Sequence, residues 1–166
     1  MRYAQIREYD VANGPGIRTS FFVTGCKNNC KGCFNKEYQD FNYGDIWGEK
    51  ETQKIIRYLK KDEIEGLTIL GGEPFEHIDD LIDIIEQIRK YSDKSIWIYS
   101  GFTFEDLIKK ENAKHLLTLC DIIVDGLFEE DKLDLRLQFR GSSNQRIIDI
   151  KQSLKENKTI IRKDFI

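Results

Sequence analysis

The chain has 166 residues, of which 40% are hydrophobic and 33% charged, and its formal net charge is −3. This length suits one domain with a substantial core and leaves little room for two. The mildly acidic charge gives no reason to expect a nucleic acid as a partner. The N-terminus carries charges where a signal peptide would be apolar, and no apolar run approaches the roughly 20 residues of a membrane span. We therefore expect a cytoplasmic protein that does not enter a membrane.

Short apolar runs, each bounded by glycine or polar residues, predict buried β-strands in chain order. They cover residues 19–23, 67–70, 95–99, 121–124 and 146–150, and a weaker alternation over residues 3–11 suggests one more strand, at an edge. Apolar residues at helical spacing predict a helix over residues 52–61 and a second, of about 14 residues, that begins near Ile78. Thr103 is the predicted N-cap of a third helix.

Strand followed by helix and again by strand is the pattern of parallel strands joined by right-handed crossovers. About five strands are too few for the eight of a closed (β/α) barrel. We therefore predict an α/β fold, a partial and open barrel of about five mainly parallel strands, in a single domain over residues 1–150. The C-terminal tail, residues 151–166, belongs to no recognisable motif, and its structure stays open at this point.

Three of the four cysteines, Cys26, Cys30 and Cys33, lie within eight residues, directly after the strand predicted at residues 19–23. Gly25 and Gly32 allow the tight loop that would bring the thiolates round one centre. Clustered thiolates bind a soft metal or an iron-sulfur cluster. Structural zinc sites and electron-transfer clusters usually have four protein ligands. Three thiolates leave one iron of a four-iron cluster without a protein ligand, so the spacing favours chemistry at the cluster.

A zinc site is the alternative reading of the same loop. It would need a fourth ligand, which Cys120, His77 or His115 could supply, and would make the protein a zinc-stabilised binding module without enzymatic activity. We expect Cys120 to be a buried apolar residue at the start of a strand. A disulfide is disfavoured because the chain shows no sign of export.

Other motifs also follow predicted strands. Gly71-Gly72-Glu73-Pro74 comes directly after the strand at residues 67–70, and a third motif, Asn13-Gly14-Pro15-Gly16-Ile17-Arg18, precedes the cysteine loop. The cysteine spacing together with Gly-Gly-Glu resembles the radical S-adenosylmethionine enzymes. The upstream motif narrows the resemblance to the activases of glycyl radical enzymes. Val124-Asp125-Gly126, with residues 139–146, makes the chain similar to the activating proteins of anaerobic ribonucleotide reductases.

This resemblance covers roughly residues 5–150 and implies a set of site residues. Cys26, Cys30 and Cys33 would hold one 4Fe-4S cluster whose fourth iron binds S-adenosylmethionine. The methionine ammonium would be received by Gly71, Gly72 and Glu73. Contacts to the adenine are implied for the residues around the last cysteine, and weaker candidates for the carboxylate, ribose or ammonium follow other strands: Gly32, Cys33 and Phe34, then Ser100 and Asp125.

The resemblance also implies the reaction and the partners. A reduced cluster would cleave S-adenosylmethionine, and the 5'-deoxyadenosyl radical would generate a glycyl radical in a glycine loop of anaerobic ribonucleoside-triphosphate reductase. The electron would come from a flavodoxin-like donor, and no catalytic side chain is implied beyond the cluster and cofactor. An activase of another glycyl radical enzyme, such as pyruvate formate-lyase, stays an alternative.

Overall fold

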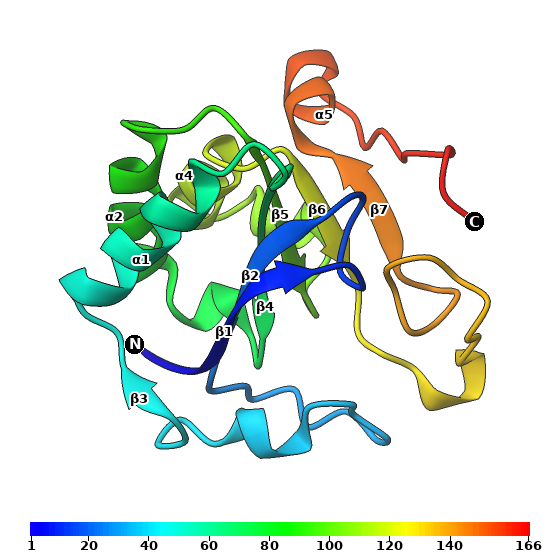
Figure 1. The fold of residues 1–166 in the computed structure, drawn as a ribbon. Coiled ribbons are helices and arrows are strands. Elements are labelled where there is room, and N and C mark those ends of the chain that lie inside the picture. The colour runs from blue at the N-terminus through cyan, green and yellow to red at the C-terminus, as the bar shows by residue number, and fades with distance from the viewer.

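The computed structural model describes residues 1–166 as an α/β fold with one mixed, seven-stranded sheet (Figure 1). The order of the strands across the sheet is β3-β1-β2-β4-β5-β6-β7. Their bounds are β1 Arg2–Asp10, β2 Arg18–Val23, β3 Asp45–Ile46, β4 Gly66–Gly71, β5 Ser95–Ser100, β6 Ile122–Asp125 and β7 Arg146–Asp149. All of the predicted strands form.

The prediction of about five mainly parallel strands was wrong in number and in direction. Strands β2, β4, β5 and β6 are parallel, but β1 and β3 at one side and β7 at the other pair antiparallel with their neighbours. The reason lies in the connections, because a parallel pair needs a long crossover whereas a short turn returns the chain antiparallel. Residues 11–17 form such a turn between β1 and β2, and residues 126–145 contain no helix longer than the 3₁₀ turn Glu130–Lys132.

The helices follow the predicted apolar spacing. Their bounds are α1 Glu49–Leu59, α2 Ile78–Arg89, α3 Phe104–Leu107, α4 Glu111–Thr118 and α5 Ile150–Glu156. Thr103 is the N-cap of α3, and its hydroxyl accepts a bond from the Asp106 amide at 3.2 Å. Helices α1, α2 and α4 lie together on one side of the sheet in Figure 1. They enclose the main core with Phe21, Leu67 and Ile98 of the parallel strands. No helix combines the length and the apolar character that crossing a membrane requires.

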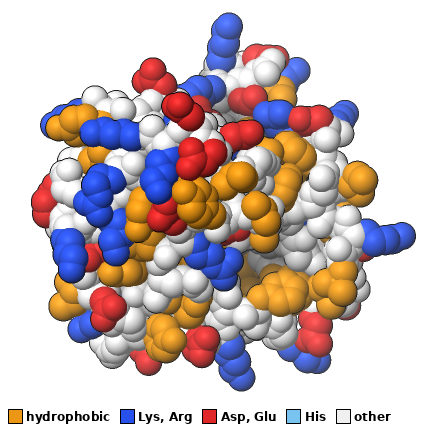
Figure 2. Space-filling model, viewed as in Figure 1, with side chains coloured by type: hydrophobic (Ala, Val, Ile, Leu, Met, Phe, Trp, Pro, Cys, Tyr) orange, Lys and Arg blue, Asp and Glu red, His pale blue; other side chains and the backbone are white.

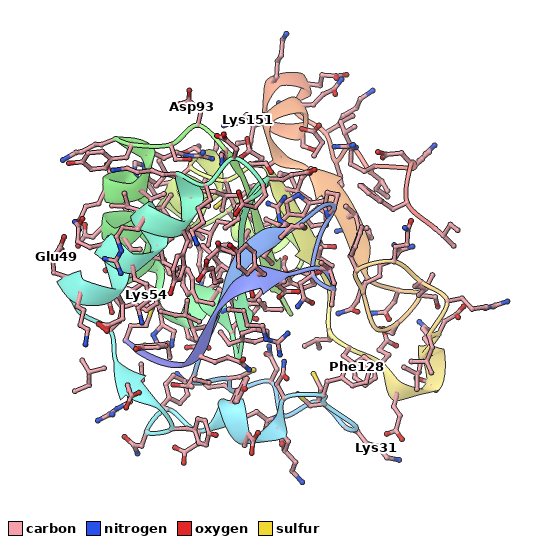
Figure 3. All side chains as sticks on the ribbon, viewed as in Figure 1. Lys31, Glu49, Lys54, Asp93, Phe128 and Lys151 are labelled. Carbon is pink, nitrogen blue, oxygen red and sulfur yellow. The ribbon has the colours of Figure 1, made fainter.

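Parallel register brings the sequence motifs to one edge of the sheet. Val23, which ends β2, pairs with Gly71 of β4, and Ser100, which ends β5, pairs with Asp125 of β6. The cysteine loop follows β2 at this edge. In Figure 3, Lys31 of that loop and Phe128 after β6 are labelled at this end of the molecule, while Asp93, in the turn before β5, lies at the opposite end.

The other side of the sheet carries a small second core. It consists of Trp97, Ile122, Val124 and Ile147, with Tyr99, Phe139 and Phe165 packed against it. Phe165 belongs to the C-terminal tail, which the sequence left unassigned. The tail first forms helix α5 and then returns along β7, where Ile161 pairs with Ile148 in an antiparallel bridge.

Candidate functional site

A cavity of about 600 Å³ opens at the carboxyl edge of the parallel strands. This volume is in the range of ordinary small-molecule sites. Three segments line most of it: the cysteine loop, the glycines and glutamate after β4, and the long connection between β6 and β7, residues 126–145, which we call the wall segment. Figure 2 shows a hollow on this face of the molecule, with hydrophobic side chains at its rim. Two of these segments are motifs that the sequence singled out, and the third includes Gly126 and residues 139–145, which the resemblance had marked.

All three clustered cysteines line the cavity. The loop that carries them is fixed at its start, because the Gly25 amide donates to the Tyr38 carbonyl at 2.7 Å and the Cys26 amide to the Gln39 carbonyl at 3.0 Å. Gly25 has a φ of +102°, which a residue with a side chain rarely adopts. Burial raises the pKa of Cys26 and of Cys30, so these two thiols stay protonated at neutral pH when they bind no metal. Binding of a metal or cluster must release those protons.

The ligands that a zinc site would need lie elsewhere. Cys120 is fully buried in the main core, just before β6 and thus at the opposite end of that strand from the cavity. His115 is on the exposed side of α4, and the His77 ring is bonded to the Thr24 carbonyl at 2.6 Å. Nowhere do three or more His, Cys, Asp or Glu side chains lie close enough together to hold a single metal ion. Three soft thiolates without a fourth sulfur or imidazole in the cavity fit a cluster that keeps one iron open.

The two glycines after β4 are required by close backbone packing. Gly71 has a φ of +133°, and a Cβ atom there would lie 2.1 Å from the Val23 carbonyl oxygen. A Cβ atom on Gly72 would lie 2.7 Å from the Gly25 carbonyl oxygen. The Glu73 amide donates to that same Gly25 carbonyl at 2.8 Å. The cysteine loop and the Gly-Gly-Glu motif are therefore packed backbone against backbone.

Glu73 brings a buried carboxylate to the cavity, with only 1% of its surface exposed. One oxygen accepts bonds from the Gly101 amide at 2.7 Å and from Asn28 at 3.4 Å, and the other from the Phe75 amide and the Ser100 hydroxyl, both at 3.0 Å. Burial raises the pKa of Glu73 to about 7 in spite of these donors. No cationic side chain is bonded to it, so a positively charged ligand would stabilise its ionised form.

Ser100 and Asp125, the two weaker predicted ligands, are placed differently. Ser100 lines the cavity, but its hydroxyl donates to Glu73 and accepts a bond from the Phe102 amide at 3.0 Å. Asp125 is fully buried and does not line the cavity. Its carboxylate accepts two bonds from Arg146, at 2.6 and 3.0 Å, and one from the Phe104 amide at 2.7 Å. Ser100 orients Glu73, and Asp125 links β6 to β7 and α3.

Phe34 and the wall segment form an aromatic side of the cavity. Phe34 lies 4.9 Å from Phe128, measured between ring centres, and both line the cavity. Gly141 packs closely beside them, because a Cβ atom there would lie 2.7 Å from the Phe34 ring. Gly32, by contrast, is exposed and does not line the cavity.

The sequence analysis did not assign several of the cavity residues to the site. They come from the hairpin strand β1, from the inner face of β5 and from the wall segment, and include Arg7, Tyr99, Phe128 and Arg140. Of these, only Arg140 falls inside a stretch that the resemblance had marked, residues 139–146. Their contribution depends on how the wall segment folds back over the sheet, which no local pattern encodes.

Comparison with known proteins places the chain in a family. The model of the 4Fe-4S single cluster domain matches residues 12–148. The anaerobic ribonucleoside-triphosphate reductase-activating protein of Haemophilus influenzae is 36% identical over 152 residues, which cover 89% of this chain and 97% of that protein. The proteins of the same name from Enterobacteria phage T4 and Escherichia coli K12 are each 34% identical, over 89% and 87% of this chain and 93% and 96% of their own lengths. The chain belongs to this family of activating proteins.

Membership identifies the chain as an enzyme of the activase type with a 4Fe-4S cluster domain. The matched residues 12–148 include the cysteine loop, Gly71–Glu73 and the whole wall segment. Residues 149–166, which form α5 and the returning tail, lie beyond the family model.

Proposed function

We propose that this protein activates an anaerobic ribonucleoside-triphosphate reductase, by generating a glycyl radical in that partner at the expense of S-adenosylmethionine. When bound, the cluster would supply the electron for reductive cleavage of S-adenosylmethionine, and the resulting 5'-deoxyadenosyl radical would remove a hydrogen atom from a glycine of the reductase. A flavodoxin-like protein is the proposed electron donor. The observation that carries the proposal is that three free cysteines and the buried carboxylate of Glu73 line one cavity.

The cysteine loop would hold the cluster through Cys26, Cys30 and Cys33. Support comes from the absence of a fourth thiol or an imidazole among the cavity residues, since a site with three protein ligands keeps one position open for a cofactor. The parallel strands β2, β4, β5 and β6 would act as the remnant of an open barrel, with the cluster at their carboxyl ends, where α/β folds usually carry their active sites.

Glu73 would bind the ammonium group of the methionine portion. Its carboxylate is held by four donors and has no cationic side chain bonded to it, so an incoming ammonium would supply the missing positive charge. Backbone carbonyls of Gly71 and Gly72 are the proposed further acceptors. Phe34 would contact the adenine with its exposed ring, and Gly32 and Cys33 would contribute main-chain atoms.

The mouth of the cavity supports a macromolecular substrate. Three apolar side chains that line the cavity are also exposed to solvent: Leu135 by 85%, Phe34 by 64% and Leu127 by 44%. A reactive primary radical must be shielded from water. A glycine loop of the reductase that covers these side chains would both bury them and close the cavity.

Anaerobic reconstitution with iron and sulfide, followed by reduction, tests the proposal. The wild-type protein should bind four irons and release 5'-deoxyadenosine from S-adenosylmethionine. Cys30→Ala should lose cluster and product. Cys120→Ala is the matched control, because Cys120 is buried away from the cavity, and it should keep both. A wild-type protein that binds zinc without acid-labile sulfide would refute the proposal.

The identity of the partner needs a second experiment. The reconstituted protein is mixed with the anaerobic reductase or with pyruvate formate-lyase, and the glycyl radical is detected by electron paramagnetic resonance. The proposal expects the radical on the reductase. A radical on pyruvate formate-lyase alone would instead establish the alternative activase.

A further inference from the structure

The chain after α5 does not end as a free tail. Residues 157–166, which we call the strap, turn back and run along the outer edge of β7. The Asp149 amide donates to the Ile160 carbonyl at 2.9 Å, and the Arg162 amide donates to the Ile147 carbonyl at 2.8 Å. These bonds fix the path of the strap, so that its last residues reach the side of the sheet that carries the second core (Figure 1).

The end of the strap is joined to the wall segment. The ring of Phe165 lies 5.6 Å from Trp97 of β5 and 5.4 Å from Phe139 of the wall segment, and Phe139 lies 5.6 Å from Trp97. The three rings meet edge to face, the favoured geometry of aromatic pairs. The Gln138 amide also donates to the Ile166 carbonyl at 3.0 Å. Phe165 therefore holds Phe139 against the sheet.

Phe139 is the residue of the wall segment that depends most on such support. Its φ of +63° is unfavourable for a side chain of this size, so surrounding contacts must stabilise it. Its carbonyl accepts a bond from the Tyr99 hydroxyl at 2.5 Å. The next residue, Arg140, lines the cavity, and Gly141 packs against the Phe34 ring. A shift of Phe139 would therefore be transmitted to the side of the cavity that faces the cysteine loop.

We propose that Phe165 is a positioning residue, which acts through Phe139 to hold the wall segment over the cavity and so sets the affinity for S-adenosylmethionine. The part of this inference that concerns the cofactor rests on the proposed function. The family model ends at residue 148, before the strap begins. The family match therefore does not cover the contact between Phe165 and the wall segment.

Hydrogen exchange on the reconstituted full-length protein tests the contact without any activity. The reporters are the amides of Leu137 and Gly141, which are bonded within the wall segment to Asp134 and Gln145 and not to the strap. In Phe165→Ala both amides should exchange about tenfold faster, because the loss of two aromatic pairs is worth about that factor. Phe165→Leu, which keeps much of the volume, should stay nearer to the wild type. Ile84→Val, a destabilising change in α2, serves as the control and should leave these amides unchanged.

Binding and turnover supply the second readout. Phe165→Ala should raise the Kd for S-adenosylmethionine about tenfold and change the rate of cleavage at saturation less than twofold, with iron content unchanged. Ile84→Val should change neither. A mere loss of stability would affect both variants alike.

Two results would overturn the proposal: wild-type exchange at both reporter amides in Phe165→Ala, or faster exchange there with an unchanged Kd. If the wild-type protein neither binds nor cleaves S-adenosylmethionine, the proposed function fails. In that case the hydrogen-exchange measurement still decides whether Phe165 holds the wall segment.

Discussion

Replacement of Asp125 by Asn tests whether this carboxylate stabilises the fold or binds the cofactor. The resemblance predicted Asp125 as a cofactor ligand, but the carboxylate is bonded to Arg146 and to the Phe104 amide. Asn has the same shape and lacks the charge. Its amino group would face either the guanidinium or the amide N–H, and each of these is also a donor. We therefore expect Asp125→Asn to lose stability and to keep the affinity for S-adenosylmethionine.

The size of the loss follows from the burial of the pair. Removing one partner of a fully buried ion pair costs about 3–5 kcal/mol. Asp125 is fully buried, but the Arg146 side chain is 30% exposed and also pairs with Glu105 at 2.6 Å, so part of the interaction survives. We expect about 2–3 kcal/mol. For a chain of this length this corresponds to a fall in Tm of about 5–10 °C.

Thermal and urea unfolding of the wild-type and variant proteins measure this loss, and calorimetry of the reconstituted proteins measures the Kd for S-adenosylmethionine. Asp121→Asn is the matched control. Asp121 precedes the same strand at its other end, and its carboxylate pairs with Arg89 at 2.9 Å with 26% of its side chain exposed. The control should lose about 1 kcal/mol, because the pair is more exposed. Neither variant should change the Kd more than twofold.

The opposite pattern would refute this reasoning. If Asp125→Asn unfolds like the wild type and binds S-adenosylmethionine tenfold more weakly, the carboxylate contacts the cofactor and the bond to Arg146 is not kept in the loaded protein. A large loss in both measurements would mean that the β6–β7 connection and the cofactor site are coupled, which the contacts of Asp125 do not predict.

Three further variants test other features of the fold and the site. Glu73 has a pKa of about 7 against 4.5 for the free side chain, so between these values the folded protein holds a proton that the unfolded chain has lost. The stability of the cluster-free protein should therefore fall as the pH rises from 4.5 to about 7. At 1.36 kcal/mol for each pH unit the fall is up to about 3 kcal/mol, and urea unfolding of Glu73→Gln should show a much weaker dependence. Gly71→Ala should cost about 3 kcal/mol or more in urea unfolding, because its φ is +133° and the added Cβ atom meets a carbonyl of β2 at 2.1 Å. Wild-type stability in this variant would show that the backbone there relaxes freely. Arg18→Met should cost about 2–4 kcal/mol, because carbonyl groups of β4 and β5 lose a charged donor, and calorimetric unfolding with an unchanged Tm would contradict that role.

Strand positions were predictable because each parallel strand is a short, continuous apolar run between polar turns. The direction of each strand was not predictable, because it depends on the structure of the segment that connects it to the strand before it. The stretch before β7 has the length of a crossover with a helix, but it forms the wall segment, and β7 consequently returns antiparallel. The same holds for β3, whose two residues pair with β1 by tertiary contact and not by an apolar pattern.

The candidate site was predictable where spacing alone carries the chemistry. Cys26, Cys30 and Cys33 line the cavity because a loop of eight residues cannot scatter them, and Gly71–Glu73 joins them because adjacent parallel strands end together. Asp125 also ends a strand, but side chains at successive strand positions point to opposite faces of the sheet. Its partner Arg146 comes from a strand whose direction was unknown. A position at the right edge of a sheet is thus not enough to make a residue a ligand.

The Asn13–Arg18 motif is a second case in which residues that indicate the family are not cofactor ligands. Arg18 is 1% exposed, and its guanidinium donates to the Leu67 and Ser95 carbonyls at 3.0 and 2.9 Å, with no carboxylate bonded to it. Burial lowers its pKa to about 10, which still leaves it charged. The Thr68 hydroxyl joins the two ends of the motif, because it donates to the Asn13 carbonyl at 2.7 Å and accepts from Arg18 at 2.9 Å. The motif that helped to identify the family therefore acts here mainly by tying the β1–β2 turn to the strands that carry the cavity.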